Sequence, residues 1–249
     1  VVDLRRALGG EIEHIAEDLT AVVPAGATLS EVAEVLNPSS QLLPIDPPNA
    51  ESATIGGALS VAVGGPLRRR YGLPRDMVLG MTVLRADGEM VTAGGRVVKN
   101  VTGYDLMRAW CGSLGTLGIV TSVSVRVLPK PAAREFTCEV RDIPGGCAIV
   151  DRLLTAGVRP EVAEIITAGR AGPVLLLRLT EPTVGAAQRA VGNRLLGASK
   201  GEEYLIARAA GFRERDVLSV RIARLQGDLA ALPARLEPFR PPPVALRLA

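Results

Sequence analysis

The alternation of apolar and polar residues along the chain predicts a series of short strands and helices. Residues 19–24 (Leu-Thr-Ala-Val-Val-Pro) have the β-branched composition of a short buried strand that ends at a proline. Residues 29–36 place apolar side chains at helical spacing, and Thr28 with Glu31 completes a capping box in front of them. A strand followed by a capped helix is therefore expected at the start of the chain.

Two later segments have the alternation that is typical of antiparallel strands. Residues 78–85 and 89–92 predict a hairpin, because Asp87-Gly88 between them favours a tight turn. Residues 119–128 alternate between aliphatic side chains and serine or arginine, which predicts a half-buried strand. Residues 104–110 leave room for two helical turns between these strands.

The segment Pro129-Lys130-Pro131 is the best boundary between domains, at 1–130 and 131–249. Beyond it the pattern predicts a strand at 135–140, a helix at 145–156, strands at 162–167 and 174–180, a helix at 183–196, and a helical tail from 211 to 233. This order favours an α+β domain with an antiparallel sheet.

Composition and charge limit the function classes. The 249 residues are 47% hydrophobic, enough for a sizeable core, and no apolar run approaches the roughly 20 residues of a membrane span. The net charge is +3, but aromatic residues make up 3% of the chain, which leaves few platforms on which nucleic-acid bases could stack. A solvated arginine-rich surface is the favoured interpretation, including the cluster Arg68-Arg69-Arg70.

Histidine and cysteine are scarce. His14 is the single histidine, and Cys111, Cys138 and Cys147 lie far apart, so a self-contained zinc site or iron–sulfur cluster is not expected. His14 is interpreted as an ordinary strand position. An odd cysteine count and a start without a signal-like apolar stretch favour a reducing cytosol.

Glycine is concentrated in one region, since 13 of the 27 glycines lie between Gly56 and Gly118. Thr54-Ile55-Gly56-Gly57 precedes a short apolar helix expected at 58–63, and such a turn can direct free N–H groups at a phosphate. Gly112–Gly118 enters a strand directly, which lets a planar ligand lie against bare backbone. Turn glycines in a loop-rich fold are the alternative, and the spacing leaves both open.

Four strings in this order carry a resemblance: Pro47–Ala50, Ala53–Gly57, Gly94–Leu106 with Lys-Asn-Val-Thr-Gly-Tyr-Asp-Leu, and Gly112–Val120 with Gly-Ser-Leu-Gly-Thr-Leu-Gly. Together they resemble the FAD-binding domain of the vanillyl-alcohol oxidase/PCMH-type flavoprotein family, within it most closely the E subunits of bacterial glycolate oxidases. The resemblance implies an α+β fold. A PCMH-type FAD-binding domain at 1–130 would be followed by a smaller α+β cap-like domain with an antiparallel sheet at 131–249.

The resemblance also implies FAD as cofactor and a set of residues that would contact it. The turn 54–57 would line the pyrophosphate and one side of the flavin, and 115–120 would approach the adenine and ribose with backbone groups. Tyr104 would lie near the flavin-facing wall, with a core aromatic as the alternative. The expected cofactor-binding residues are Pro48, Thr54, Ile55, Gly56, Gly57, Gly103, Tyr104, Gly115, Thr116, Gly118, Ile119 and Val120.

One departure from the family concerns the N-terminal end. Family members begin with a strand–loop–helix unit whose glycine-rich loop wraps the pyrophosphate, whereas Gly9-Gly10 is no such loop and the strand at 19–24 follows almost at once. The first FAD subdomain is therefore expected to be shortened or missing. Its loss is expected to leave apolar surface exposed in 19–43, where a partner would bind.

The resemblance implies an FAD-binding subunit of a glycolate oxidase-type complex, which oxidises 2-hydroxy acids with flavin-mediated electron transfer. The expected partners are a larger catalytic flavin subunit and an iron–sulfur subunit. The chain itself is expected in the cytoplasm, or held at the inner membrane by a partner subunit. A non-catalytic structural subunit that has lost FAD is the alternative. Because no histidine follows His14, the chain is not expected to be active alone.

Overall fold

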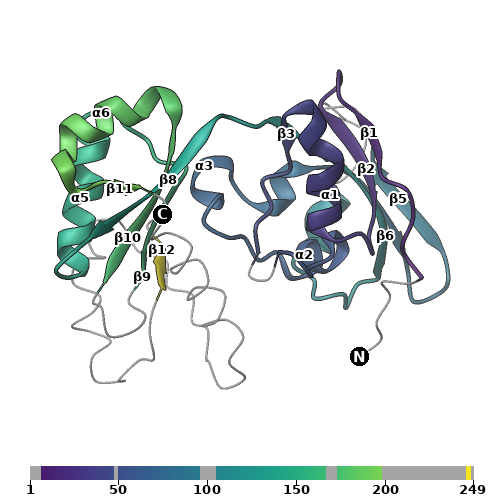
Figure 1. Cartoon of the computed structure of the whole chain (residues 1–249). Helices are drawn as coiled ribbons and strands as arrows, with labels where there is room; N and C mark the ends of the chain where they lie inside the picture. Colours follow the sequence, from purple (N-terminus) through teal and green to yellow (C-terminus); the bar gives the residue numbers. More distant parts are fainter. Residues whose placement is uncertain (1–6, 48–49, 96–104, 167–172, 198–244, 248–249) are drawn as a thin grey trace, which may run out of the picture. The chain divides into compact units, whose positions relative to one another are not determined.

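The computed structural model describes residues 7–47, 50–95, 105–166, 173–197 and 245–247. The chain divides into two compact units, 1–130 and 131–249, and the division falls within the Pro-Lys-Pro segment. Each unit combines helices with an antiparallel sheet, so the predicted α+β class is confirmed (Figure 1).

The first unit is built on a five-stranded sheet in the order β1-β2-β6-β4-β5 with every neighbouring pair antiparallel. Its strands are β1 (Glu13–Ile15), β2 (Thr20–Pro24), β4 (Val78–Leu84), β5 (Met90–Gly94) and β6 (Ile119–Arg126). A separate two-stranded pair joins β3 (Gln41–Leu42) to β7 (Leu128–Pro129). The β4–β5 pair is the hairpin that the sequence predicts.

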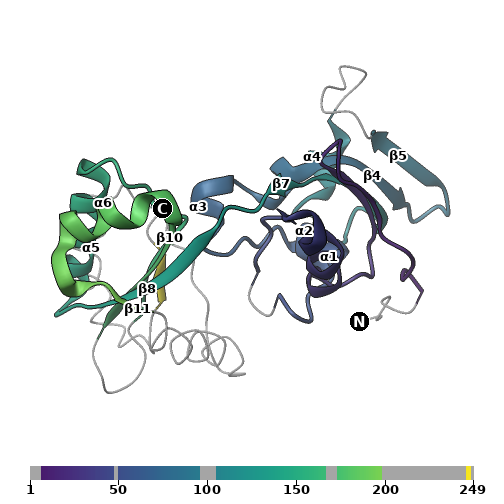
Figure 2. The same cartoon turned by 45° about the horizontal axis from the view of Figure 1, so that its top comes forward.

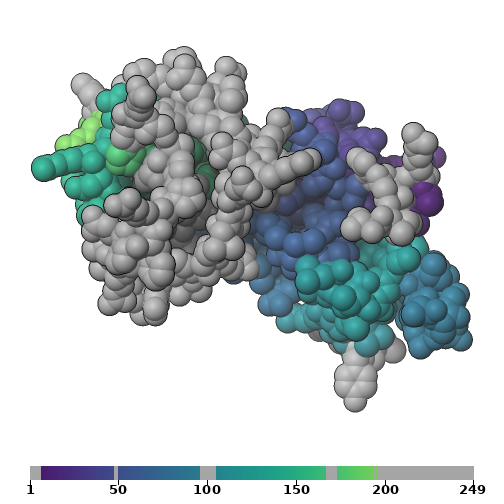
Figure 3. All heavy atoms as spheres, turned by 90° about the horizontal axis from the view of Figure 1, so that it is seen from below, coloured from purple at the N-terminus to yellow at the C-terminus, as the bar shows by residue number. Residues whose placement is uncertain are grey.

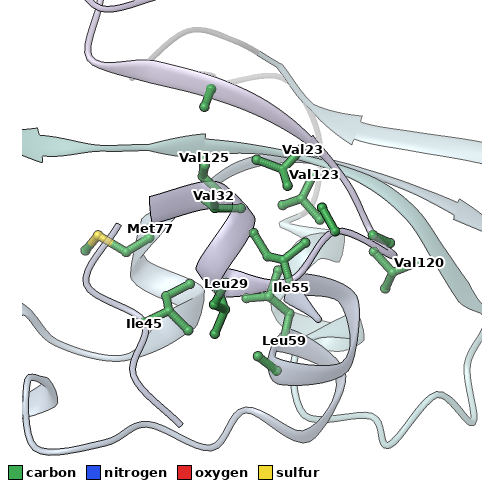
Figure 4. Packing of buried hydrophobic residues seen from close by; sticks show 14 of the residues in the cluster. Val23, Leu29, Val32, Ile45, Ile55, Leu59, Met77, Val120, Val123 and Val125 are labelled. Carbon is green, nitrogen blue, oxygen red and sulfur yellow. The ribbon is translucent and has the colours of Figure 1, made fainter. Parts of the chain in front are cut away.

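Two helices, α1 (Leu29–Leu36) and α2 (Ile55–Val61), cover one face of this sheet (Figure 1). Alternate residues of β2 and β6 point into the core, where Val23 and Val123 meet Val32 of α1 and Ile55 of α2 (Figure 4). Each aliphatic side chain buried in this way contributes about 1.5–3 kcal/mol. Two short helices, α3 (Arg68–Tyr71) and α4 (Leu106–Trp110), lie in the connections before β4 and after β5.

The second unit contains the sheet β11-β8-β10-β9-β12, antiparallel throughout, with α5 and α6 side by side on one face (Figure 1, Figure 2). Its elements are β8 (Ala133–Glu139), α5 (Ile143–Thr155), β9 (Val162–Ile166), β10 (Val174–Thr180), α6 (Glu181–Val191), β11 (Leu196–Gly197) and β12 (Ala245–Arg247). The predicted antiparallel sheet is confirmed. The helical tail expected at 211–233 lies outside the described residues.

Three helices begin earlier than the apolar pattern predicts, and polar residues explain two of these starts. α2 begins at Ile55 because Thr54 Oγ1 caps the N–H of Gly57, and α5 begins at Ile143 because the Asp142 side chain accepts from Gly145. α6 begins at Glu181, follows Thr180, and ends before Gly192, whose φ is +68°. Among the described residues, no helix is long and apolar enough to cross a membrane.

Candidate functional site

The N-termini of α1 and α2 lie side by side. Their N-cap residues, Thr28 and Thr54, form an antiparallel β-bridge, and the N–H of Ile55 donates to the carbonyl of Ala27 at 2.9 Å. The positive ends of two helix dipoles therefore meet at one edge of the first unit. The turn Thr54–Gly57, expected to contact the FAD pyrophosphate, forms part of this edge.

A carboxylate already occupies the N-terminus of α1. Glu31 Oε2 accepts from the backbone N–H of Thr28 at 2.7 Å, and Thr28 Oγ1 accepts from the N–H of Glu31 at 3.1 Å. The carboxylate also accepts from the Thr28 hydroxyl at 2.9 Å, and the hydrogen bonds from the Thr28 N–H and, second, from this hydroxyl lower the pKa of Glu31. The predicted capping box is confirmed, and its charge makes this helix end less favourable for a second anion.

The first turn of α2 has no free backbone donors at its three leading residues. The N–H groups of Ile55, Gly56 and Gly57 each donate to an acceptor in the protein. The acceptors are, in turn, the carbonyl oxygens of Ala27 and Ala25, both at 2.9 Å, and Thr54 Oγ1 at 3.2 Å. The expectation that this turn directs free N–H groups at a phosphate is therefore wrong, because the α1–α2 junction uses them.

Close packing against Ala25 explains why residue 56 is a glycine, whereas Gly57 is exposed. A Cβ on Gly56 would lie 2.8 Å from Ala25 Cβ and 2.9 Å from its carbonyl oxygen, so a side chain has no room there. A Cβ on Gly57 would meet only Thr54 Oγ1, at 3.1 Å. Gly57 is the glycine of this pair that leaves bare backbone on the surface.

The loop 112–118 packs against the other end of α2. The N–H groups of Gly112 and Leu114 donate to the carbonyls of Leu59 and Ser60 at 3.0 and 2.8 Å. Leu59 and Ser60 lie two and three residues beyond Gly57, so the loop contacts the C-terminal half of this short helix. Figure 3 shows the segment after residue 105, in teal, on the surface of the first unit.

Backbone groups in this loop are free to bind a ligand. Within the part of the chain that the structure describes, no hydrogen bond is formed by the N–H groups of Gly115, Leu117 and Gly118. Gly115 has a φ of +75° and open space where a Cβ would stand. At Gly118 a Cβ would lie 2.5 Å from Val83 Cγ1, so this glycine lets the chain enter β6.

Large exposed apolar side chains gather around the same loop, on Val61, Leu106, Leu114, Leu117 and Ile119. Leu114 is 70% exposed and Leu117 is 55% exposed. In 19–43, where exposed apolar surface is expected, Val35 alone of the large apolar residues described is exposed. That expectation is wrong because Val32 and Leu36 of α1 pack into the core.

The described site residues come from two segments, the first turn of α2 and the loop that leads into β6; Ala25 connects them, because its carbonyl accepts from Gly56 and its N–H donates to Thr121 of β6. Thr54, Ile55, Gly56 and Gly57 form the first, and Gly115, Thr116, Gly118, Ile119 and Val120 form the second. The side chains of Ile55 and Val120 belong to the core, so only their backbone can face a ligand. Pro48, Gly103 and Tyr104 lie outside the described residues. Sequence reasoning missed Leu114 and Leu117, although two leucines in a glycine loop between short elements are a signal of exposed apolar surface.

The histidine and two of the cysteines are held within the protein by a hydrogen bond or by burial. His14 Nε2 hydrogen-bonds Gln41 Oε1 at 2.8 Å, and the buried Gln41 donates to the carbonyl of Ala16. Burial raises the pKa of the Cys111 and Cys138 thiols to about 11. No group of three or more His, Cys, Asp or Glu in the described ranges is arranged to hold a metal ion.

The first unit is similar to a known family over most of its length. Residues 1–94 match a family described as FAD binding domain. The match covers 94 of the 249 residues. The resemblance to PCMH-type flavoproteins is thereby confirmed, and FAD is supported as the cofactor.

Curated relatives match a longer stretch of the chain than the family model does. The chain is 34% identical over 151 residues to glycolate oxidase subunit GlcD of Bacillus subtilis, which is 60% of this chain and 32% of that protein. It is 38% identical over 125 residues to glycolate oxidase subunit GlcE of Escherichia coli, which is 50% of this chain and 36% of that protein. A D-lactate dehydrogenase of Archaeoglobus fulgidus is 34% identical over 120 residues. The chain thus spans about a third of the length of these relatives.

Solved structures with the same fold cover both units. An alkyldihydroxyacetonephosphate synthase matches 84% of this chain and 46% of its own, with a TM-score of 0.66 and 17% identity. The grass pollen allergen Phl p 4, which has glucose dehydrogenase activity, matches 72% of this chain and 37% of its own, with a TM-score of 0.54 and 20% identity. At these identities the likeness shows the fold alone.

The geometry fits FAD at the loop 112–118 better than at the turn 54–57. The loop combines unsatisfied backbone donors, a glycine with open space above it and flanking apolar side chains, which suits a planar ligand with polar edges. At the turn, only the exposed Gly57 and the surface around Thr54 remain available.

Proposed function

We propose that this chain is an FAD-binding part of a 2-hydroxy-acid oxidoreductase of the glycolate oxidase type. The family match and the glycolate oxidase and D-lactate dehydrogenase relatives support this assignment. The observation that carries it is the loop 112–118, whose free N–H groups and exposed leucines lie in the segment with the family's glycine string.

FAD, when bound, supplies the two-electron redox chemistry of such an enzyme. The residues of this chain bind and orient it. The N–H groups of Gly115, Leu117 and Gly118 donate to polar edges of the ligand, and Leu114 covers an apolar part. Thr116 stabilises the loop, because its Oγ1 donates to the carbonyl of Ser113 at 2.7 Å.

The turn 54–57 keeps its proposed place beside the cofactor with a reduced role. Because its three leading N–H groups are paired, it contributes the bare surface of Gly57 and the dipole of α2 rather than free donors. Pro48, Gly103 and Tyr104 remain proposed contacts on the strength of the family resemblance.

The chain does not supply a histidine base for the substrate hydroxyl. Its one histidine is hydrogen-bonded to Gln41 within the first unit. We therefore assign the base to a larger flavin subunit and the onward electron transfer to an iron–sulfur subunit, in the cytoplasm or at the inner membrane through a partner. The isolated chain should show negligible turnover of glycolate or lactate with a dye acceptor.

A structural subunit without FAD is the second candidate, and one observation favours it. Both helix N-termini at the α1–α2 junction are satisfied within the protein, α1 by the Glu31 carboxylate and α2 by three protein acceptors. This junction therefore leaves little positive potential for a pyrophosphate.

The visible absorbance of bound flavin in the purified chain, with and without added FAD, separates the two candidates. Gly115→Asn is the informative variant, because asparagine tolerates a positive φ and places a side chain over the loop. Gly157→Asn is the matched control, since Gly157 has a φ of +76° and open space like Gly115 but lies after α5.

We expect Gly115→Asn to lose most of the flavin while its circular dichroism and that of the control stay unchanged. If both variants retain flavin equally, the loop 112–118 is not part of the binding site. Absence of flavin from the parent chain at saturating FAD would favour the structural subunit.

A further inference from the structure

Arg126, the last residue of β6, points to the face of the first sheet that the helices leave open. Val123 and Val125 on the same strand belong to the core, so Ser124 and Arg126 alternate to the opposite face. Across the sheet the residue opposite Arg126 is Thr20 on β2, which is 5% exposed. Ile15 on β1 follows in the same row.

The Arg126 side chain is partly buried, and its Nε has no partner among the described residues. Its Nε is shielded from solvent and makes no hydrogen bond, and no ion pair to its side chain occurs in the described ranges. Glu17 and Asp18, in the turn before β2, are exposed and do not pair with it.

Other arginines of the first unit do have carboxylate partners. Arg85 pairs with Asp87 at 2.6 Å, and Arg108 pairs with Asp105 at 2.7 Å, although both arginines are exposed. A partly buried cation without an anion is unfavourable, because desolvation is not offset by pairing. The described residues supply no anion to this guanidinium, so the position is suited to a bound anion.

The surroundings of Arg126 select the kind of anion. The other residues on this face of the five strands, listed across the sheet in the order β1-β2-β6-β4-β5, are Glu13, Ile15, Thr20, Val22, Pro24, Ile119, Ser122, Ser124, Gly80, Thr82, Leu84, Met90, Thr92 and Gly94. None is a second lysine or arginine, hydroxyls on Thr20 and Ser124 lie beside Arg126, and the one carboxylate of the face, Glu13, has an interaction of its own. A single guanidinium edge matches a carboxylate in charge and in bidentate geometry.

We propose that Arg126 anchors a carboxylate-binding site on the open face of the first sheet. Two sources share this chemistry: a small organic acid in solution, or an acidic side chain of a partner protein. The site is separate from the loop 112–118, because Arg126 ends the strand that Ile119 begins, seven residues away along an extended chain.

Thermal unfolding of the flavin-free chain, followed by the fluorescence of Trp110, tests the site. Trp110 is the single tryptophan and is buried in the first unit, so the signal reports this unit. The parent, Arg126→Gln and Arg126→Lys are compared in sodium acetate and in sodium chloride of equal ionic strength. Arg152→Gln, at an exposed position on α5, is the control. A six-residue glutamate peptide forms the second arm.

We expect acetate to raise the unfolding temperature of the parent and the control by about 2–4 °C, to have no effect on Arg126→Gln, and to have a smaller effect on Arg126→Lys. In chloride alone, Arg126→Gln should unfold at the same temperature as the parent or higher, because an unpaired charge is removed. If the glutamate peptide raises the unfolding temperature more per carboxylate than acetate does, the natural ligand is an acidic protein segment. If only acetate raises it, the ligand is a small organic acid.

Three results would overturn the proposal: no acetate effect on the parent, an equal effect on all variants, or a lowered unfolding temperature for Arg126→Gln in chloride. If Arg126→Gln fails to fold, the parent and Arg126→Lys still decide, because equal acetate effects on both would exclude the bidentate site. None of these outcomes depends on flavin binding.

Discussion

Thr28 and Thr54 cap two different helices and face each other in a single β-bridge. The bridge joins the starts of α1 and α2, which are 26 positions apart in sequence, and places the Glu31 carboxylate next to the junction. The edge of the first unit expected to hold a phosphate is therefore an internally satisfied junction.

The charge of Glu31 should make stability depend on pH. Hydrogen bonds from Thr28 lower the pKa of Glu31 below 4.5, so its contribution is full above that value and is lost as the pH falls through the lowered pKa. Glu31→Gln keeps an acceptor in the capping box but does not titrate. Between about pH 5 and pH 3, the urea midpoint should therefore fall more for the parent than for Glu31→Gln. Glu34→Gln, on the exposed side of α1, should follow the parent.

Gly56 and Gly57 should respond differently to the same substitution. Gly56→Ala forces a Cβ against Ala25, which the 2.9 Å hydrogen bond from the Gly56 N–H holds in place, and should destabilise the unit by about 1–3 kcal/mol. Gly57→Ala is exposed and improves helix propensity, so it should remain within about 0.5 kcal/mol of the parent or exceed it. Urea unfolding followed by Trp110 fluorescence measures both, and equal effects would contradict the packing assigned to Gly56.

The three thiols should be slow to react in the folded protein. Burial raises the pKa of Cys111 and Cys138 to about 11 and also raises that of Cys147. At pH 8 only about one in a thousand of the first two thiols is therefore ionised, and the thiolate is the reactive form. Titration with a disulfide reagent should be slow at pH 8, faster near pH 10 and immediate in urea. Immediate reaction of any thiol in the folded chain at pH 8 would contradict this.

Local signals in the sequence predict most of the elements and miss how they pack together. The capping box of α1 and the Asp-Gly hairpin depend on neighbouring residues, so they were readable from the sequence. The early start of α2 depends on a side-chain cap, and the role of Gly56 depends on contact with Ala25, thirty-one positions earlier. Spacing alone could not separate a glycine that makes room for packing from one that exposes backbone to a ligand.

The candidate site shows the same division. The glycine string at 112–118 predicts a loop. Only the structure shows which N–H groups of the loop donate to carbonyl oxygens of α2 and which remain free. Arg126 was indistinguishable from a solvated strand arginine in the sequence. Its unpartnered Nε depends on the register of β2 and β6.

The exposed leucines of the loop 112–118 should carry the binding of FAD or of a partner subunit. Leu117 is 55% exposed beside the free N–H groups, whereas Val35 is 37% exposed in the region where the sequence predicted the interface. Leu117→Ser removes apolar contact area without touching the core, so it should reduce flavin retention or the yield of a co-expressed complex several-fold. Val35→Ser should leave both unchanged. Size-exclusion chromatography with flavin absorbance measures the two effects together. If Val35→Ser were the damaging variant, the interface would lie on α1, and the site assigned to the loop would lose its support.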